Sequence, residues 1–217
     1  RHIMLPKLDE IERWTEPQRA RFAAGKHGDS LDAVAALMDN HAHFTVDIAG
    51  RRETVSTMAS EQDAINTRRA EITKLLDATA AEADAYHEQL TLSKERLEKL
   101  PQIDKVESWC GNQRALFAAG DYGDTVPAVT ALLDQFESFS VNVEPKKSLL
   151  ESLTSEQSVI MDRRAEVQAV METTLTEAAE YHNQLLLSQE RLEKLPMLDA
   201  VEAWQDQQLE FFAAGEV

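Results

Sequence analysis

The fold is decided by the stretch from Ser60 to Trp109, which reads SEQDAINTRRAEITKLLDATAAEADAYHEQLTLSKERLEKLPQIDKVESW and recurs in closely similar form from Ser155 to Trp204. In both copies a seam of residues is spaced alternately three and four apart, and this heptad spacing keeps one face of a helix turned toward partner helices. No Pro or Gly interrupts the run from Gln62 to Leu100. The sequence therefore predicts a long helix whose seam must be covered by other helices. The seam residues are Gln62, Ile65, Arg69, Ile72, Leu76, Thr79, Ala83, Tyr86, Leu90, Ser93, Leu97 and Leu100 in the first copy, and Gln157, Ile160, Arg164, Val167, Met171, Thr174, Ala178, Tyr181, Leu185, Ser188, Leu192 and Leu195 in the second.

The repeat extends over the whole chain. Trp14, Trp109 and Trp204 are spaced 95 residues apart, and all three are expected to pack in a core. Residues 5–99 align on residues 100–194 without a gap. A repeat of this length is a structural unit, and units that recur in this way are usually stacked in series. The predicted domains are a first unit at 5–99, a second unit at 100–194, and the first helix of a third, truncated unit at 195–217. Residues 1–4 have no counterpart in the repeat, and we expect them to be a remnant of the expression vector.

Each unit is predicted to contain three helical segments. The first, 7–24 or 102–119, ends at Gly25 or Gly120, a residue suited to a left-handed cap. The second begins after Ser30 or Thr125, whose hydroxyl can accept a hydrogen bond from a free amide of the helix. The predicted inward residues are Leu8, Ile11, Trp14 and Phe22 on the first segment with Ile103, Val106, Trp109 and Phe117 in its copy, and Leu31, Val34, Leu37, Met38, His41, Phe44, Ile48 and Val55 on the second with Val126, Val129, Leu132, Leu133, Phe136, Phe139, Val143 and Leu150 in its copy.

Three further features bear on where the helices end. Gly50 and Pro145 occupy the same place in the second segment, and a proline inside a helix loses a hydrogen bond, so we expect a kink or break there. Ser60 and Ser155 are expected to cap the third segment. Short connections fold three amphipathic segments most simply as an antiparallel up-down-up bundle. The chain would then be all-α, with two bundles joined end to end into an elongated rod, and a hinge is expected at Pro101.

Composition narrows the class of protein. Hydrophobic residues make up 43% of the chain but aromatic residues only 6%, a balance typical of helical proteins with narrow cores. The formal net charge of −17 disfavours nucleic acid and anionic lipid as partners. No apolar run is long enough to cross a bilayer, so membrane insertion is not expected. The single cysteine, Cys110, permits no intrachain disulfide and favours a reducing, cytoplasmic compartment.

Several motifs together resemble the spectrin-repeat superfamily, and most of all the repeats of the alpha-actinin rod. They are VESW at 106–109 ahead of DYGD at 121–124, PKK at 145–147, and YHNQLLLSQERLEKL at 181–195. Where such repeats commonly have a Trp early in the third helix, this chain has Arg69 or Arg164. The resemblance implies a rod segment of an actin-crosslinking protein of the cytoskeleton. It further implies that actin filaments bind through modules outside this segment, and that the rod pairs antiparallel with a second copy.

Residues that suggest chemistry have simpler interpretations, and we assign no catalytic, cofactor-binding or metal-binding residue. Tyr86-His87 with Glu82, and Tyr181-His182 with Glu177, could suggest a metal site. Because each Glu lies five residues before its His, the two side chains do not share a helix face, whereas di-iron bundles use residues three apart. Tyr is therefore expected on the seam and His beside it.

The other candidates are interpreted in the same way. The loop around Asp121 and Asp124 lacks the central Gly and terminal Glu of a calcium loop, so its acidic residues are expected to cap helices. Arg69 and Arg164 are expected to lay their stems on apolar neighbours with their heads toward Glu. Cys110 is not expected to be reactive. The charges of 94–99 form either a solvated helix face or a contact between two chains.

Three functional hypotheses follow. The first is a non-enzymatic structural spacer that sets the distance between terminal modules. The second is a helical adaptor that binds partner helices through an uncovered apolar stripe. The third is a helical bundle that carries a metal in an internal cavity.

Overall fold

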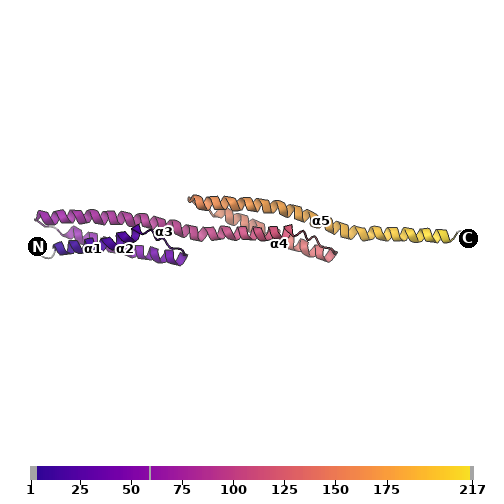
Figure 1. Ribbon diagram of the computed structural model, residues 1–217, viewed down its shortest axis with the longest axis horizontal. Helices are drawn as coiled ribbons and strands as arrows, with labels where there is room; N and C mark the ends of the chain where they lie inside the picture. Colours follow the sequence, from indigo (N-terminus) through magenta and orange to yellow (C-terminus); the bar gives the residue numbers. More distant parts are fainter. Residues whose placement is uncertain (1–3, 59, 216–217) are drawn as a thin grey trace. The chain divides into compact units, whose positions relative to one another are not determined.

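The computed structural model describes residues 4–58 and 60–215. These residues form five α-helices: α1 (Met4–Ala23), α2 (Leu31–Thr57), α3 (Asp63–Ala118), α4 (Val126–Ser152) and α5 (Ser158–Ala214) (Figure 1). The described ranges contain no β-strand, and the all-α class is confirmed. Of the predicted terminal segments, residues 1–3 and 216–217 lie outside the described residues. Met4, which we had placed in the vector remnant, is the first residue of α1.

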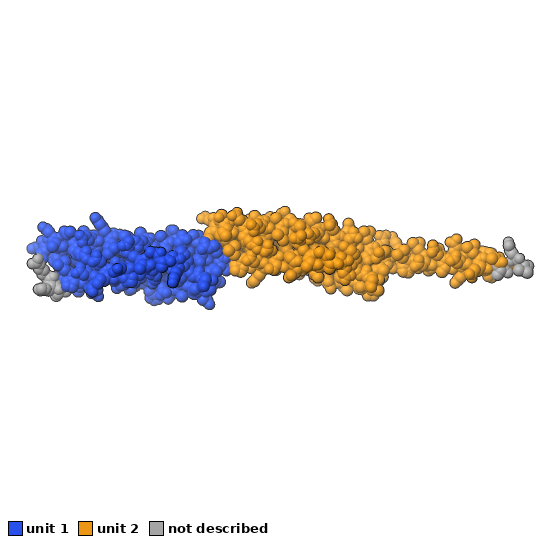
Figure 2. Space-filling view, viewed as in Figure 1, with its two compact units in different colours: residues 1–99 blue, residues 100–217 orange. Residues whose placement is uncertain are grey.

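The chain divides into two compact units, Arg1–Lys99 and Leu100–Val217 (Figure 2). Unit 1 contains α1, α2 and the N-terminal part of α3, which lie side by side in Figure 1. Its core combines residues of all three helices, among them Leu8 of α1, Val34 of α2 and Leu76 of α3, each with no exposed surface. Unit 2 is built in the same way from the C-terminal part of α3, α4 and α5, with Val106, Leu150 and Val167 in one cluster.

Contacts between helices give their directions in each unit. In unit 1 Arg68 of α3 pairs with Asp9 of α1. Farther along both helices, Glu82 of α3 pairs with Arg19 of α1, so α1 and α3 run parallel. Arg52, near the end of α2, pairs with Asp77. His41, nearer the start of α2, stacks on His87, which follows Asp77 on α3. The direction of α2 is therefore opposite, and unit 1 is the up-down-up bundle that the sequence predicts.

Unit 2 has the same topology. Arg163 of α5 pairs with Asp104 of α3, and Glu177 pairs with Arg114, so these two helices are parallel. Phe136 of α4 stacks on His182, whereas Glu151, later in α4, accepts a hydrogen bond from Arg164, earlier in α5. The α4 helix therefore runs antiparallel to α5.

The seam is confirmed in both units, since the same positions of α3 and α5 are buried. Arg69 and Arg164 are half-buried, and the seam is more open at its two ends, where Gln62 and Leu195 are exposed. The buried seam residues are Ile65, Ile72, Leu76, Thr79, Ala83, Tyr86, Leu90 and Ser93 of α3, and Ile160, Val167, Met171, Thr174, Ala178, Tyr181, Leu185 and Ser188 of α5.

Two predictions about helix ends are confirmed. Gly25 and Gly120, just after α1 and α3, have φ of 62° and 65°, the left-handed conformation that glycine adopts without strain. Ser30 and Thr125 are the N-caps of α2 and α4, and their hydroxyls accept hydrogen bonds from the amides of Ala33 and Ala128 at 3.3 and 3.4 Å.

Other predictions about the helices are wrong. The first segment of unit 2 is not a separate helix, because α3 continues through Pro101 to Ala118, and α5 likewise continues through Pro196. Proline removes one hydrogen bond, but Leu97 before Pro101 packs against one core and Ile103 after it is buried in the other. No break occurs at Gly50 or Pro145, which lie inside α2 and α4.

Ser60 and Ser155 are not N-cap residues. Their hydroxyls accept hydrogen bonds from the amides of Gln62 and Gln157 in the turn that precedes each helix. The N-cap of α5 is Gln157, which makes no side-chain capping bond. Leu31 and Val126 were predicted to point inward but are 43% and 39% exposed, because the first turn of α2 and α4 extends past the core.

Candidate functional site

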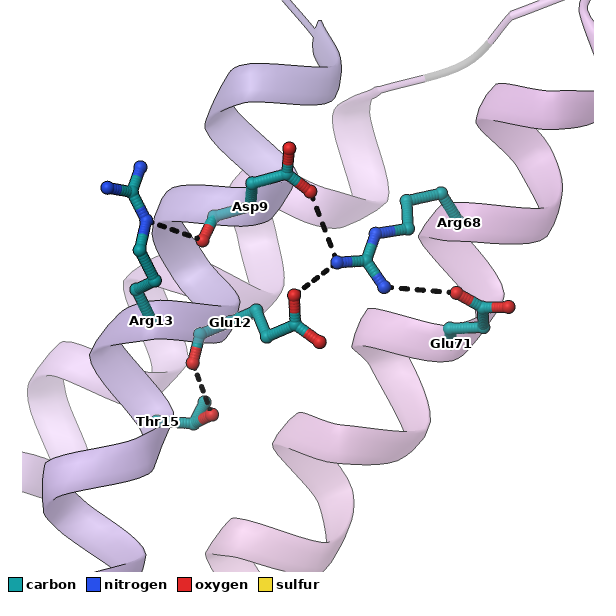
Figure 3. A network of polar contacts seen from close by, with 6 residues as sticks. All are labelled: Asp9, Glu12, Arg13, Thr15, Arg68 and Glu71. Atoms are coloured by element: carbon teal, nitrogen blue, oxygen red, sulfur yellow. Dashed lines mark hydrogen bonds and ion pairs between the residues drawn. The ribbon is translucent and has the colours of Figure 1, made fainter.

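A network of charged side chains joins α1 to α3 in unit 1 (Figure 3). The Arg68 guanidinium lies 3.1 Å from a carboxylate oxygen of Asp9 and 3.1 Å from one of Glu71, and it also donates to Glu12. Hydrogen bonds to Glu71, Glu12 and Asp9 raise the pKa of Arg68 above its ordinary value. One planar cation with several donors thus holds carboxylates of two helices at a fixed register.

The same network recurs in unit 2. Arg163 lies 2.9 Å from Asp104 and 3.2 Å from Glu166, and it donates to Glu107. Each of these four residues stands 95 positions after its counterpart in unit 1. Hydrogen bonds to Glu107, Asp104 and Glu166 raise the pKa of Arg163 in the same way.

A second charged contact joins the same pair of helices farther along. Arg19 donates from Nε and Nη2 to Glu82 at 2.9 and 2.6 Å, and Arg114 makes the same two-pronged contact with Glu177 at 2.7 and 2.7 Å. The hydrogen bond from the arginine lowers the pKa of Glu82 and of Glu177. The arrangement fixes the register of the two helices.

Our sequence reasoning missed both contacts. We considered Glu82 and Glu177 only as possible metal ligands, although each binds an arginine. The signal that could have found the contacts was the recurrence of a few charged residues of the first segment, since other charged positions there change between the copies. The recurring residues are Asp9, Glu12 and Arg19, which return as Asp104, Glu107 and Arg114. Periodicity of apolar residues, on which we relied, carries no information about these flanking positions.

The Tyr-His pairs lie as predicted. Tyr86 and Tyr181 are buried on the seam, and their hydroxyls donate to the carbonyls of Lys26 and Asp121 at 2.6 and 2.9 Å. His87 and His182 flank them. Across residues 4–58 and 60–215, no three His, Cys, Asp or Glu side chains are grouped so as to hold a metal ion.

The seam arginines are only partly as predicted. Their stems are half-buried, but Arg69 donates to the carbonyl of Met58 at 3.3 Å and Arg164 to that of Glu151 at 3.5 Å. The last carbonyls of a helix have no partner within the helix and accept readily, so they replace the Glu carboxylates that we expected.

The remaining candidates have structural roles. Asp121 accepts a hydrogen bond from the amide of Gly123 at 3.0 Å in the loop before α4. Cys110 is fully buried with its sulfur 3.9 Å from that of Met171, and burial raises the pKa of the thiol. Lys94 and Lys99 pair with Glu98 and Glu95 of their own helix at 3.8 and 2.6 Å.

Two of the three repeated tryptophans pack as predicted. Trp14 stacks on Phe44 with centroids 5.6 Å apart, and the Arg51 guanidinium lies 3.8 Å above its ring. Trp109 stacks on Phe139 at 5.4 Å. The prediction is wrong for Trp204, which is 61% exposed on α5.

No family model matches the chain. Over 167 residues, 72% of its length, the chain is 22% identical to "Spectrin alpha chain, erythrocytic 1" of Mus musculus. The aligned part spans about 7% of that relative. The similarity indicates spectrin-like repeats. It does not single out alpha-actinin among the proteins that contain them.

The end of α5 carries an exposed apolar face. Three of its residues, Leu198, Val201 and Trp204, occupy positions of the repeat that are covered in unit 1. Their counterparts are the buried Leu8 and Ile11 and the half-buried Trp14 of α1. None of the described helices is both long and apolar enough to cross a membrane. The exposed residues of this face are Leu195, Met197, Leu198, Val201, Trp204, Leu209, Phe211 and Phe212.

Proposed function

We propose that the chain is a spectrin-like rod segment of a cytoskeletal protein, and that it sets the distance between modules at the ends of that protein. The observation that carries the proposal is the exact repetition of the Arg68 network and of the Arg19–Glu82 contact in unit 2. A spacer needs helices that do not slide, and these contacts fix register in each unit. The role is structural rather than enzymatic.

We further propose how the units are arranged and what kind of protein contains them. Units 5–99 and 100–194 are bundles in series, and residues 195–217 begin a third unit whose other helices cover the exposed face of α5. The parent protein is cytoplasmic, of the spectrin and alpha-actinin type, and crosslinks actin filaments through modules outside this segment. The similarity to a spectrin alpha chain and the continuity of α3 through Pro101 support this view.

Small-angle X-ray scattering of the purified chain tests the spacer. A compact globule of this length has a radius of gyration of about 17 Å. The 56 residues of α3 alone extend about 84 Å, and a thin rod of that length has a radius of gyration of about 24 Å. The radius of gyration of the whole chain should therefore exceed about 24 Å. A value near 17 Å would refute the spacer.

Antiparallel pairing of two chains through the rod is a separate part of the proposal. At −17 per chain, like charges repel, and salt screens that repulsion over about 10 Å at 0.1 M. Sedimentation equilibrium should show a dimer fraction that rises between 0.05 and about 0.5 M NaCl. A chain that stays monomeric throughout removes pairing but leaves the spacer intact.

A helical adaptor is the second candidate, and the exposed apolar face of α5 favours it. The two candidates predict different fluorescence of Trp204 when the chain is extended by the segment that follows it in the parent protein. In a third unit the emission of Trp204 shifts to shorter wavelength because the ring becomes covered. In an adaptor it stays that of a solvated indole until a partner helix is added.

A further inference from the structure

Unit 1 contains a polar cluster where its three helices meet. It consists of Arg21 of α1, His41 of α2 and His87 of α3. The two imidazole rings are stacked, with centroids 4.5 Å apart and planes inclined by 25°. Arg21 Nε, His41 Nε2 and His87 Nδ1 are buried and have no hydrogen-bond partner among the described residues. Each of these half-buried side chains thus has one buried nitrogen that makes no hydrogen bond.

The charges around His41 favour its neutral form. Burial lowers its pKa most, followed by the proximity of His87, and the Arg21 cation adds a smaller effect of the same sign. Two features of α3 oppose this change: the backbone of Ala83 and the Asp84 carboxylate favour the charged ring. The net effect is a lowered pKa, so the folded unit resists protonation of His41 more than the unfolded chain does.

The direction of the pH dependence follows from this difference. The unfolded chain takes up a proton near pH 6.5, the ordinary value for histidine, whereas the folded unit does so only at lower pH. Between these two values the unfolded state binds more protons, so stability falls as the pH falls. The loss begins near pH 6.5 and is complete once the folded ring is also protonated.

Unit 2 contains a natural comparison. The positions of Arg21, His41 and Asp84 are occupied there by Leu116, Phe136 and Ala179, and only the second histidine, His182, is retained. His182 stacks on Phe136 with centroids 4.4 Å apart and planes inclined by 5°. The stacked geometry is therefore the same, but the facing ring is uncharged at every pH and the arginine is absent.

We propose that the Arg21–His41–His87 cluster is an acid-sensitive latch, which destabilises unit 1 as the pH falls below about 6.5 while unit 2 keeps its stability. Protonation of His41 would place a second cation near Arg21, beside buried nitrogens that make no hydrogen bond. This inference goes beyond the spacer, because it makes one of two otherwise matching units responsive to its surroundings.

The first test is urea unfolding of the full chain at pH 7.5, 6.5, 5.5 and 5.0. The variant His41→Phe copies the residue of unit 2, and His43→Phe removes an exposed histidine of the same helix as a control. For one proton, the unfolding equilibrium constant of the wild type should rise by up to about ten-fold per pH unit relative to His41→Phe. His43→Phe should follow the wild type. A wild type and a His41→Phe variant with the same pH dependence would overturn the proposal.

The second test assigns the effect to a unit. Trp109→Phe with Trp204→Phe leaves Trp14 as the reporter of unit 1, and Trp14→Phe with Trp204→Phe leaves Trp109 as the reporter of unit 2. The urea midpoint read by Trp14 should fall more on acidification than that read by Trp109. Adding Leu116→Arg and Phe136→His to the variant that keeps only Trp109 should make unit 2 acid-sensitive as well. Equal pH dependence of both reporters in the unsubstituted units contradicts the proposal.

A third measurement uses the wild-type chain and needs no variant to fold. In an NMR titration followed at the histidine Cε1 protons, His41 should titrate below the ordinary value of about 6.5. A midpoint at or above 6.5 for His41 overturns the latch.

Discussion

At the scale of single residues, Arg68 and Arg163 do more than ordinary surface ion pairs. Isolated exposed pairs contribute about 0–1 kcal/mol, because solvent screens them and two flexible side chains must be ordered. The side chain of Arg68 is only 25% exposed and meets three carboxylates, two of them on another helix. The cost of ordering one arginine is therefore shared among several contacts.

Replacing Arg68 by Met should lower the free energy of unfolding by about 1–2 kcal/mol, since the network is lost and three acidic groups are left close together. The matched control is Arg52→Met, which removes a single exposed contact with Asp77 and should change stability by less than about 0.5 kcal/mol. Urea unfolding measures both. The difference between the two variants should shrink in 1 M NaCl, and a difference that salt does not change would show that packing of the arginine stem, not charge, is responsible.

The Arg19–Glu82 contact gives a pH-dependent prediction. Its hydrogen bond lowers the pKa of Glu82, so the stabilisation is present above the ordinary value near 4.5 and is lost as the pH falls through the lowered value. The stability difference between the wild type and Glu82→Gln should be greatest at pH 6–7 and should shrink as the pH falls below about 4.5. Thermal unfolding at a series of pH values measures it, and a difference that does not shrink on acidification would contradict the charged contact.

The three tryptophans of the repeat should differ in their effect on stability. Trp109→Ala removes the ring stacked on Phe139 and should cost about 3 kcal/mol. Trp204→Ala removes an exposed ring and should change stability by less than about 0.5 kcal/mol in this chain. Both are measured by urea unfolding followed by circular dichroism. Equal losses would mean that the end of α5 is covered in solution.

At the scale of the elements, the loop between α1 and α2 depends on glycine. Gly28 has a φ of +83°, and a Cβ at this position would lie 2.9 Å from both the amide nitrogen and Cγ2 of Val34. Gly28→Ala should therefore cost about 2 kcal/mol or more. In the middle of α2, a Cβ on Gly50 would meet no atom within 4 Å, and Gly50→Ala should stabilise the chain by about 0.5–1 kcal/mol. Thermal unfolding of both variants checks the opposite signs.

The predictions of helices from the sequence succeeded where periodicity was strong and failed where a single residue was given too much weight. The seam of α3 and α5, the caps at Gly25 and Ser30, and the antiparallel direction of α2 all follow from spacing and from short loops. The separate helix expected after Pro101 and the break expected at Pro145 are absent, because packing on both sides of a proline can outweigh one lost hydrogen bond. Propensity alone does not report that packing.

At the scale of the whole molecule, the repeat could be predicted from the sequence, whereas the charged network could not. A period of 95 residues is visible in the letters, and it indicates recurring units. Which acidic residue meets which arginine depends on helix register, since Asp9 and Arg68 are far apart in the chain and their side chains could find several partners. The His41–His87 contact was missed for the same reason, although His41 was predicted to point inward.

The buried thiol of Cys110 allows the rate at which unit 2 opens to be measured. It is the single cysteine of the sequence, it is fully buried, and burial raises its pKa, so the closed form keeps the unreactive thiol. A chromogenic disulfide reagent should then label the chain only as fast as the core around Met171 opens, with no engineered substitution. Labelling at several reagent concentrations should reach a plateau rate, and that rate measures how often the core around Cys110 comes apart.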